Sequence, residues 1–555
     1  MIPLRIFFRK KHMRLFFLTL VPITLYTILK AYFTNETSRL ELKTNGNVSY
    51  LTATTYLRND AACRIPKLSP LPISIKHLIN NTDPNTGNCE ANHSLLFEST
   101  LDFQLIPKKS LQQIEQIGFE SCCYKLISKR PGSFYKFRLS DRCYPVSLEN
   151  PTKIPREHEF LAIFCESHTK SKNFANDSLV DTHAFVPLKD NVEERIKGIN
   201  IVEDSLNIAI VGLDSLSHMN FLRSMPKSHS FLIDELKAVE MNGYNSVGYH
   251  TYSNLIVALT SRNEKEINFT CDIQHSLTTV HLFGRSLPTK VSALFFGEDA
   301  VRNRSGETSD GIFNFGLTGF QSSPTDYYLR PFGLVAERLR KTFVDLCYGP
   351  RLAFQTLLNY TQKLAYTMGK DKRYFQFIWS GTIAHKDLND GRLGDKHLLS
   401  TLMWYRKGGY FNQTIFILMS DHGMRWGPIM DTMQDRLTTT PYDLYETLSD
   451  LVSLKRISNT KIQARESFLL QEESSSSLPR GISLFLPIPL SRTCQMAGIE
   501  GASFEATVSK SRTGVWSVSG TIDRTNLYGN QSHCVQDKEV KLYCYCNDLR
   551  NFKHH

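Results

Sequence analysis

The chain has 555 residues, of which 41% are hydrophobic and 21% charged, and its formal net charge at pH 7 is +11. This length is more than one ordinary hydrophobic core holds, and the composition excludes an intrinsically disordered chain. Basic residues are scattered after the N-terminus, so we expect no nucleic-acid partner. The charge fits either a slightly basic secretory protein or one that binds phosphate-bearing or acidic-lipid partners.

The N-terminal stretch predicts a membrane anchor. Arg14 and Lys30 flank a run of 15 uncharged residues, Leu15 to Leu29. The run is shorter than the roughly 20 residues that span a bilayer. The long side chains of Arg14 and Lys30 can reach the membrane interface, which lets the helix extend beyond the uncharged run. A cleaved signal peptide is the alternative, although no small-x-small cleavage site follows the run. We expect a signal anchor at 13–33, a cytoplasmic tail at 1–12, and the remaining chain in the lumen or outside the cell.

Two further features agree with that side of the membrane. All 12 cysteines follow the anchor, and cysteines usually pair in an oxidising compartment. Their connectivity cannot be read from the sequence. We expect a disulfide-bonded, single-pass type II membrane glycoprotein of the Golgi or plasma membrane, or alternatively a secreted one. Asn-x-Ser/Thr glycosylation sequons also all follow the anchor, at Asn35, Asn47, Asn80, Asn92, Asn176, Asn268, Asn303, Asn359, Asn412 and Asn530.

The rest of the chain divides by composition into a polar stalk at 34–60, a cysteine-bearing N-terminal domain at 61–200, an α/β domain at 201–490 and a cysteine-bearing extension at 491–555. Within the α/β domain, apolar runs of strand length alternate with helix-like segments. This alternation predicts a mainly parallel sheet flanked by helices. The expected strands are Asn207–Leu213, Lys290–Phe296, Tyr374–Trp379 and Thr414–Met419.

Polar side chains follow three of these strands. Asp214 follows the first, His385 comes after the third, and Asp421-His422-Gly423 follows the fourth. Because ligands bind at the carboxyl ends of parallel strands, two carboxylates and a histidine there would suit a divalent metal. Each residue alone has an ordinary alternative, since Asp is a common helix cap or turn residue.

The order of these elements is more specific than any one of them. Asp214 is followed by Thr251-Tyr-Ser-Asn254 before an apolar helix-like run, then by Asp421-His422-Gly423 and Thr440-Pro-Tyr-Asp443. This order resembles the alkaline-phosphatase superfamily, which includes sulfatases, nucleotide phosphodiesterases and phosphoethanolamine or glycerophosphate transferases. In that pattern a strand-end Asp binds metal, a Thr, Ser or Cys at a helix start is the nucleophile, and Asp-His-Gly completes the metal site.

A closer resemblance is to a metazoan family, expanded in nematodes, that is called domain of unknown function 229. The resemblance extends over about residues 60 to 550. The stretches that carry it are Gly212 to Lys227, Pro324 to Pro331, Ala384 to Asn389, Met419 to Gly427 and Gly481 to Pro487.

The resemblance implies a role for each site residue. Asp214, Asp421 and His422, with Thr251 as a fourth ligand, would bind one divalent metal, zinc or manganese. Thr251 would be the nucleophile at a helix N-terminus that favours anions. Asn254 would donate to a non-bridging oxygen of the substrate. His385 would protonate or orient the leaving oxygen.

The expected activity follows from these roles. It is metal-dependent hydrolysis or transfer of a phosphoester or phosphodiester group through a covalent threonine intermediate. The substrate would be a phosphorylated small molecule, lipid or glycan in the lumen or outside the cell.

The sequence departs from the superfamily pattern in several ways. Gly381 stands four residues before His385, where two-metal members have an Asp, which favours a one-metal site. A Cys-x-Pro-x-Arg stretch is absent, which disfavours a sulfatase. Only 17 residues separate Gly423 from Pro441, where family members usually have a longer segment with a further core strand. The alternative function is therefore a non-catalytic ectodomain that serves as a binding or scaffold glycoprotein.

Overall fold

The computed structural model describes most of the chain between residues 56 and 524. The predicted cytoplasmic tail and signal anchor lie outside the described residues. In the described part of the chain, no helix is long and apolar enough to cross a membrane. The described residues are 56–59, 64–66, 69–71, 73–79, 88–91, 95–130, 136–167, 179–197, 206–241, 243–248, 250–264, 266–267, 293–301, 323–340, 346–369, 372–424, 440–452, 454–475, 478–489, 492, 496–498, 504–510 and 516–524.

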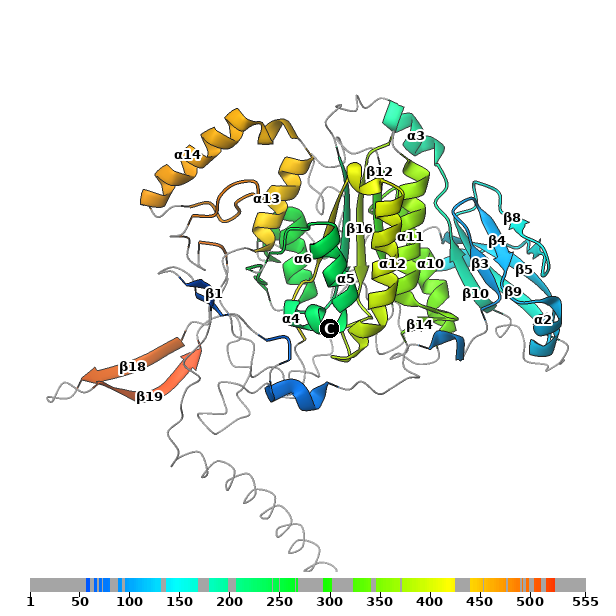
Figure 1. Ribbon diagram of the computed structural model, residues 1–555, viewed down its shortest axis with the longest axis horizontal. Helices are drawn as coiled ribbons and strands as arrows, with labels where there is room; N and C mark the ends of the chain where they lie inside the picture. Colours follow the sequence, from blue (N-terminus) through cyan, green and yellow to red (C-terminus); the bar gives the residue numbers. More distant parts are fainter. Residues whose placement is uncertain are drawn as a thin grey trace, which may run out of the picture. The chain divides into compact units, whose positions relative to one another are not determined.

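A five-stranded parallel sheet forms the centre of the fold (Figure 1). All four strands expected from the sequence are present, and all pairs in the sheet are parallel, so this part of the predicted fold class is confirmed. Residues 425–439, where a further family strand would lie, are outside the described residues. The strand order is β13 (Tyr327–Tyr328), β12 (Ala293–Glu298), β16 (Tyr374–Ser380), β11 (Asn207–Leu213) and β17 (Thr414–Met419).

Helices cover both faces of this sheet. On one face, Ile208 and Ile210 of β11 pack with the buried side chains of α6 (Thr251–Thr260) and α13 (Pro441–Leu451). On the other face, Val211 packs with residues of α11 (Ala353–Met368) and α12 (Asp395–Lys407). Every residue of β11 is buried, which is why its sequence is continuously apolar from Ile208 to Leu213 rather than alternating.

A glycine brings the two central strands together next to the first candidate ligand. Gly212 pairs with Trp379 of β16, and a Cβ atom at Gly212 would lie 1.9 Å from Cε3 of that indole ring. Only glycine therefore fits beneath the tryptophan. The indole ring lies across β11 at Gly212, two residues before Asp214.

The N-terminal part of the chain forms an antiparallel sheet. Its order is β10 (Leu179–Ala184), β9 (Phe160–Ser167), β5 (Phe119–Lys129) and β6 (Phe137–Leu139), with β7 (Tyr144–Val146) also paired to β5. A smaller sheet joins β3 (Phe97–Ser99), β4 (Gln104–Pro107) and β8 (Thr152–Lys153). Side chains of β5 and β9 share a core with α10 (Arg330–Ala336) and α11 of the α/β part.

Disulfides brace this region, as expected. Three are present among the described residues, Cys89–Cys347, Cys122–Cys165 and Cys123–Cys143. The first joins the N-terminal region to the segment after α10, across a sequence separation of 258 residues. The other cysteines, including those of the C-terminal extension, lie outside the described residues.

Buried charges lie where the antiparallel sheet meets the α/β part. Arg351 donates two hydrogen bonds to Asp181 of β10, one of them 2.9 Å long. The Lys363 amine on α11 donates to Ser99 Oγ at 2.6 Å and to the Ala184 carbonyl at 2.7 Å. Burial lowers the pKa of Lys363 to about 7.

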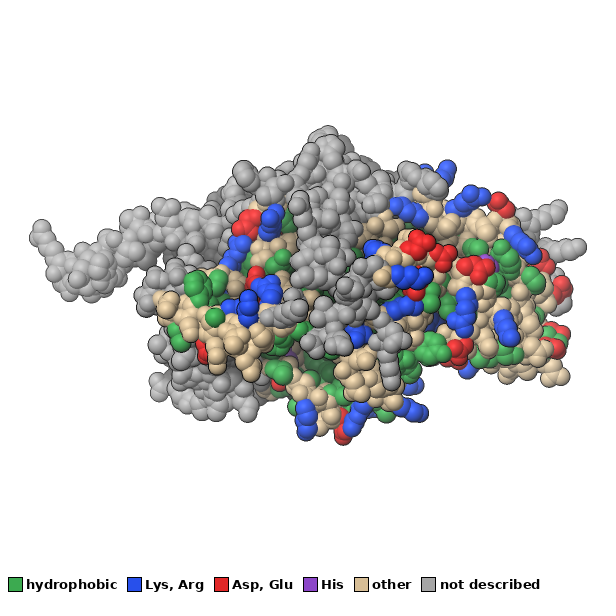
Figure 2. Space-filling view, turned by 90° about the horizontal axis from the view of Figure 1, so that it is seen from above, with side chains coloured by type: hydrophobic (Ala, Val, Ile, Leu, Met, Phe, Trp, Pro, Cys, Tyr) green, Lys and Arg blue, Asp and Glu red, His purple; other side chains and the backbone are tan. Residues whose placement is uncertain are grey.

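The remaining elements are shorter or lie at the periphery. On the described part of the face in Figure 2, Lys and Arg side chains are interspersed with Asp and Glu. The remaining helices are α2 (Leu111–Ile117), α3 (Asp190–Lys197), α4 (His218–Ser224), α5 (Pro226–Ser230) and α14 (Asn459–Ser475), and the remaining strands are β1 (Tyr56–Asn59), β2 (Arg64–Pro66), β14 (Cys347–Tyr348), β15 (Arg351–Leu352), β18 (Phe504–Lys510) and β19 (Trp516–Arg524).

Candidate metal centre

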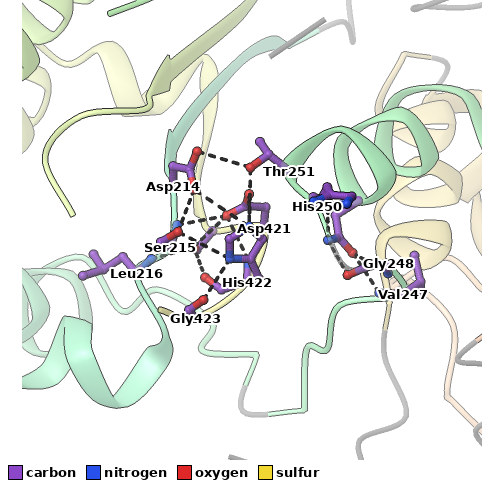
Figure 3. A network of polar contacts seen from close by, with 12 residues as sticks. Asp214, Ser215, Leu216, Val247, Gly248, His250, Thr251, Asp421, His422 and Gly423 are labelled. Atoms are coloured by element: carbon purple, nitrogen blue, oxygen red, sulfur yellow. Dashed lines mark hydrogen bonds and ion pairs between the residues drawn. The ribbon is translucent and has the colours of Figure 1, made fainter. Parts of the chain in front are cut away.

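Two carboxylates and one imidazole lie close together at the carboxyl end of the parallel sheet. Asp214 directly follows β11, and Asp421 and His422 follow β17, the neighbouring strand (Figure 3). One ligand atom from each residue lies within 4.8 Å of the others. The two carboxylates are only 5% and 2% exposed. The sheet thus places together residues that are 207 positions apart in the sequence, in a group able to hold a metal ion.

The hydrogen bonds of His422 orient its ring toward the other two residues. Its Nδ1 lies 2.8 Å from the carbonyl oxygen of Gly423, so Nδ1 carries the proton and donates to that carbonyl. In the neutral imidazole, the lone pair of Nε2 then points into the group, 3.1 Å from Asp421 Oδ2 and 3.9 Å from Asp214 Oδ1. A backbone carbonyl that fixes the far nitrogen is the usual support for a metal-binding histidine.

The two oxygens of Asp421 have different surroundings. Oδ1 accepts hydrogen bonds from the backbone N–H groups of Ser215 at 3.1 Å and His422 at 2.8 Å. Oδ2 is buried and receives no hydrogen bond, while it faces the Nε2 lone pair of His422. Two buried acceptors this close favour a cation between them, because burial of an unsatisfied carboxylate oxygen is costly. Carboxylate oxygen and imidazole nitrogen are ordinary zinc ligands, so the residues fit a divalent metal.

Thr251 lies beside this group, at the start of helix α6. Its hydroxyl donates to Asp214 Oδ2 at 3.2 Å and lies 3.4 Å from His422 Nε2. Because Thr251 is the first residue of the ten-residue helix α6, the backbone N–H groups of the first turn are directed toward the same region. The partial positive charge of a helix N-terminus favours an anion there.

Ser215 contacts all three members of the group and was not singled out by the sequence analysis. Its hydroxyl donates to Asp214 Oδ1 at 2.9 Å and lies 3.4 Å from His422 Nδ1. Its backbone has a positive φ of 62°, which is uncommon for a residue other than glycine. The position after a strand-end Asp was its only sequence signal. The left-handed turn that directs its N–H at Asp421 depends on the folded chain.

Asn254 differs from the expectation. Its side-chain oxygen accepts from the N–H groups of Val247 and Gly248 at 2.8 and 3.0 Å. Its amide nitrogen donates to the carbonyls of Gly248 and His250 at 2.9 and 3.0 Å. With its amide hydrogens directed at backbone carbonyls, Asn254 holds the loop that precedes Thr251 and is not arranged to donate to a substrate oxygen.

His385 lies in the segment after β16 and is half-buried. It is not a member of the group of possible metal ligands formed by Asp214, Asp421 and His422. Its expected role as the group that protonates or orients the leaving oxygen stays a prediction.

The Thr440-Pro-Tyr-Asp443 motif forms the start of α13. Thr440 and Asp443 make a capping box, and Pro441 occupies the first turn. The Asp443 carboxylate also receives two hydrogen bonds from Arg492, at 3.0 and 2.9 Å. Burial raises the pKa of Asp443, and the Arg492 guanidinium opposes that rise. The motif thus begins α13 and links it to Arg492.

Two solved structures are similar to this chain over part of their length. One is the lipoteichoic acid synthase LtaP from Listeria monocytogenes, with 14% sequence identity, a TM-score of 0.29, and coverage of 44% of this chain and 64% of that one. This chain therefore spans less than two thirds of that structure. The other is Ps i-CgsB in complex with k-i-k-neocarrahexaose, with 12% identity, a TM-score of 0.29, and coverage of 45% and 72%.

A comparison with curated proteins gives no match. One family does match, over residues 82–438 and 432–504, which together make up more than half of the 555 residues. Its description is "Protein of unknown function (DUF229)". The resemblance inferred from the sequence motifs is thus confirmed, and the chain belongs to the DUF229 family.

Proposed function

We propose that this protein hydrolyses or transfers a phosphoester or phosphodiester group through a covalent intermediate on Thr251. The observation that carries the proposal is the position of the Thr251 hydroxyl. It lies within hydrogen-bond distance of both Asp214 and His422, at the N-terminus of α6. A nucleophile, a basic carboxylate and an anion-binding helix end are thereby combined in one place.

The proposed ligands are Asp214, Asp421, His422 and the Thr251 hydroxyl, around one zinc or manganese ion. A bound divalent cation would lower the pKa of the threonine hydroxyl and offset the negative charge of the ester. Ser215 and the Gly423 carbonyl hold the ligands in place through the hydrogen bonds given above.

The residues of the chain account for each bond change. The Thr251 oxygen forms a bond to phosphorus while its proton passes to Asp214 Oδ2, the oxygen to which it donates. The bond from phosphorus to the leaving oxygen breaks, and the leaving oxygen takes a proton from His385 in its proposed role as general acid. Water or an acceptor hydroxyl then attacks phosphorus and gives its proton to His385, while the bond between phosphorus and the Thr251 oxygen breaks. The threonine oxygen recovers its proton from Asp214.

We also propose that this chemistry takes place in the lumen or outside the cell. The support is the predicted signal anchor, the sequons and the disulfides between described cysteines. The substrate would be a phosphorylated small molecule, lipid or glycan on that side of the membrane.

The test uses the full-length chain, expressed through a secretory pathway and purified in detergent. Zinc and manganese content and turnover of bis-p-nitrophenyl phosphate and p-nitrophenyl phosphate would be measured for wild type and for Thr251→Ala. Turnover should vanish in the variant while its passage through the secretory pathway persists. Thr260→Ala, at the other end of the same helix, is the matched control and should keep full turnover. Equal turnover of Thr251→Ala and wild type would rule out the covalent mechanism.

A non-catalytic binding ectodomain is the second candidate. It is favoured by the short segment between Gly423 and Pro441, where family members usually have a longer segment with a further core strand. The family match is divided at the same place, into residues 82–438 and 432–504. The double variant Asp421→Ala, His422→Ala separates the two functions. One metal ion per wild-type chain that is lost in this variant, together with phosphodiester turnover, excludes the non-catalytic function. A folded, glycosylated chain with neither metal nor turnover supports it.

A further inference from the structure

Asp299 is a buried carboxylate outside the proposed ligand set. It follows β12, the strand on the far side of β16 from the metal centre, and its exposed fraction is 0%. Three donors converge on its carboxylate. They are Ser380 Oγ at 2.7 Å, the Gly381 N–H at 2.7 Å and Thr382 Oγ1 at 2.8 Å. A single side chain therefore holds the last residue of β16 and the first two residues of the turn that follows it.

The end of β16 is hydrogen-bonded directly to the metal centre. The carbonyl oxygen of Ser380 accepts the backbone N–H of Asp214 at 3.0 Å. Only one residue thus separates Asp299 from a proposed metal ligand, because Ser380 donates to Asp299 through its hydroxyl and accepts from Asp214 through its carbonyl. The same turn continues to His385, three residues after Thr382.

The surroundings of Asp299 keep it fixed. Its own carbonyl oxygen accepts from Tyr348 OH at 2.6 Å and from Arg340 Nη2 at 3.0 Å. The turn also fits tightly against it, since a Cβ atom at Gly381 would lie 2.8 Å from Cβ of Ala300. Burial raises the pKa of Asp299, and Arg340 and the three donors oppose that rise. A costly buried carboxylate is retained where an apolar side chain could not hold the turn.

We propose that Asp299 is a positioning residue for the metal centre. It fixes Ser380, whose carbonyl oxygen accepts the backbone N–H of Asp214. It also fixes the first residues of the segment that leads to His385. The inference rests on the proposed function, because it treats Asp214 as a metal ligand. Residues that orient metal ligands in this indirect way typically change metal affinity about 10–100-fold when they are removed.

The test compares Asp299→Ala with Asp299→Asn in the full-length chain. The amide of the Asn variant accepts from Gly381 N–H and donates to the two hydroxyls, which can rotate to receive it. The dissociation constant for Mn²⁺ and for Zn²⁺, each added alone, would be measured by titration calorimetry. We expect about 10–100-fold weaker binding for Asp299→Ala and recovery of most of the affinity in Asp299→Asn. Unfolding in EDTA reports any loss of fold separately.

If Asp299→Ala does not fold, Ser380→Ala removes one bond of the network and should also weaken metal binding. Ser224→Ala is its matched control, because Ser224 is a buried serine that donates to Asn220 instead. A folded Asp299→Ala or Ser380→Ala chain with wild-type metal affinity overturns the proposal, as does wild type that binds neither metal. Metal binding without turnover refutes only the catalytic proposal and leaves this one to the comparison of affinities.

Discussion

Replacing Arg492 by Met tests whether the buried ion pair between Arg492 and Asp443 stabilises the fold. Arg492 is 0% exposed and Asp443 is 1% exposed, and their side chains share two hydrogen bonds. Without the guanidinium, the Asp443 carboxylate would retain the backbone N–H bonds of Thr440 at 2.8 Å and Ile482 at 2.6 Å. A buried charge would then lack its counter-ion.

Breaking a buried ion pair in this way costs about 3–5 kcal/mol, a large part of the roughly 5–15 kcal/mol that stabilises a domain. Urea unfolding would give the free energy, and hydrogen exchange would show whether the amides of α13 lose protection. The control is Arg406→Met, because Arg406 and Glu235 are 47% and 53% exposed in their ion pair. An exposed pair contributes about 0–1 kcal/mol. Similar losses in both variants would refute the reasoning.

The pH dependence of the Arg492→Met variant has a defined sign. Arg492 opposes the rise that burial causes in the pKa of Asp443, so its removal raises that pKa further. A folded-state pKa above the unfolded value of about 3.9 means that the folded chain binds the proton more tightly. Stability is then retained at low pH and lost as the pH rises through the folded pKa. The deficit relative to wild type should therefore be smaller near pH 5 than at pH 7.

Three further changes test other parts of the structure. Ser215→Ala and Ser215→Gly both remove the hydrogen bond from the Ser215 hydroxyl to Asp214, so both should weaken Zn²⁺ binding in calorimetry. In urea the Gly variant should be about 1 kcal/mol more stable than the Ala variant, because glycine adopts the positive φ of this position without strain. The pKa of Lys363 is lowered to about 7 in the folded chain, so above pH 7 the unfolded chain binds a proton on this amine that the folded chain has lost. Between pH 7 and 9, the free energy of unfolding of wild type should therefore rise by up to about 1.4 kcal/mol per pH unit relative to that of Lys363→Met. Parallel pH profiles of the two proteins would contradict this. Replacing Cys89 and Cys347 by Ser should lower the free energy of unfolding by about 2–5 kcal/mol, and an unchanged urea midpoint would show that this disulfide does not constrain the chain.

The sequence predicted the central strands and the meeting of the candidate ligands because both depend on local signals. A continuous apolar run such as Ile208–Leu213 marks a buried strand, and polar residues that follow such runs lie at the carboxyl edge of a parallel sheet. β11 pairs with β16 and with β17 without a register shift, so the ends of these strands lie side by side.

The parts that could not be predicted depend on partners that are distant in sequence. Asn254 looked like a substrate donor from its place after Thr251, but its hydrogen bonds are used by a loop whose path no local pattern specifies. Asp299 gave no signal, because its three donors lie 81 to 83 residues later in the chain. The disulfide pairing is of the same kind, since Cys89 joins a cysteine 258 residues away.

Replacing Asp421 by Asn tests whether the centre binds a metal. Asp421 Oδ2 receives no hydrogen bond and faces His422 Nε2 at 3.1 Å. Asp421→Asn would keep the oxygen that accepts from Ser215 and His422 N–H, and its new amide would donate to Nε2. The variant should therefore be about 1 kcal/mol more stable than wild type in EDTA, yet gain no stability from added Zn²⁺. Thermal unfolding with and without the metal measures both effects. A variant that is less stable than wild type in EDTA would mean that the apposed acceptors are not strained without a cation, and the main structural argument for the metal would fail.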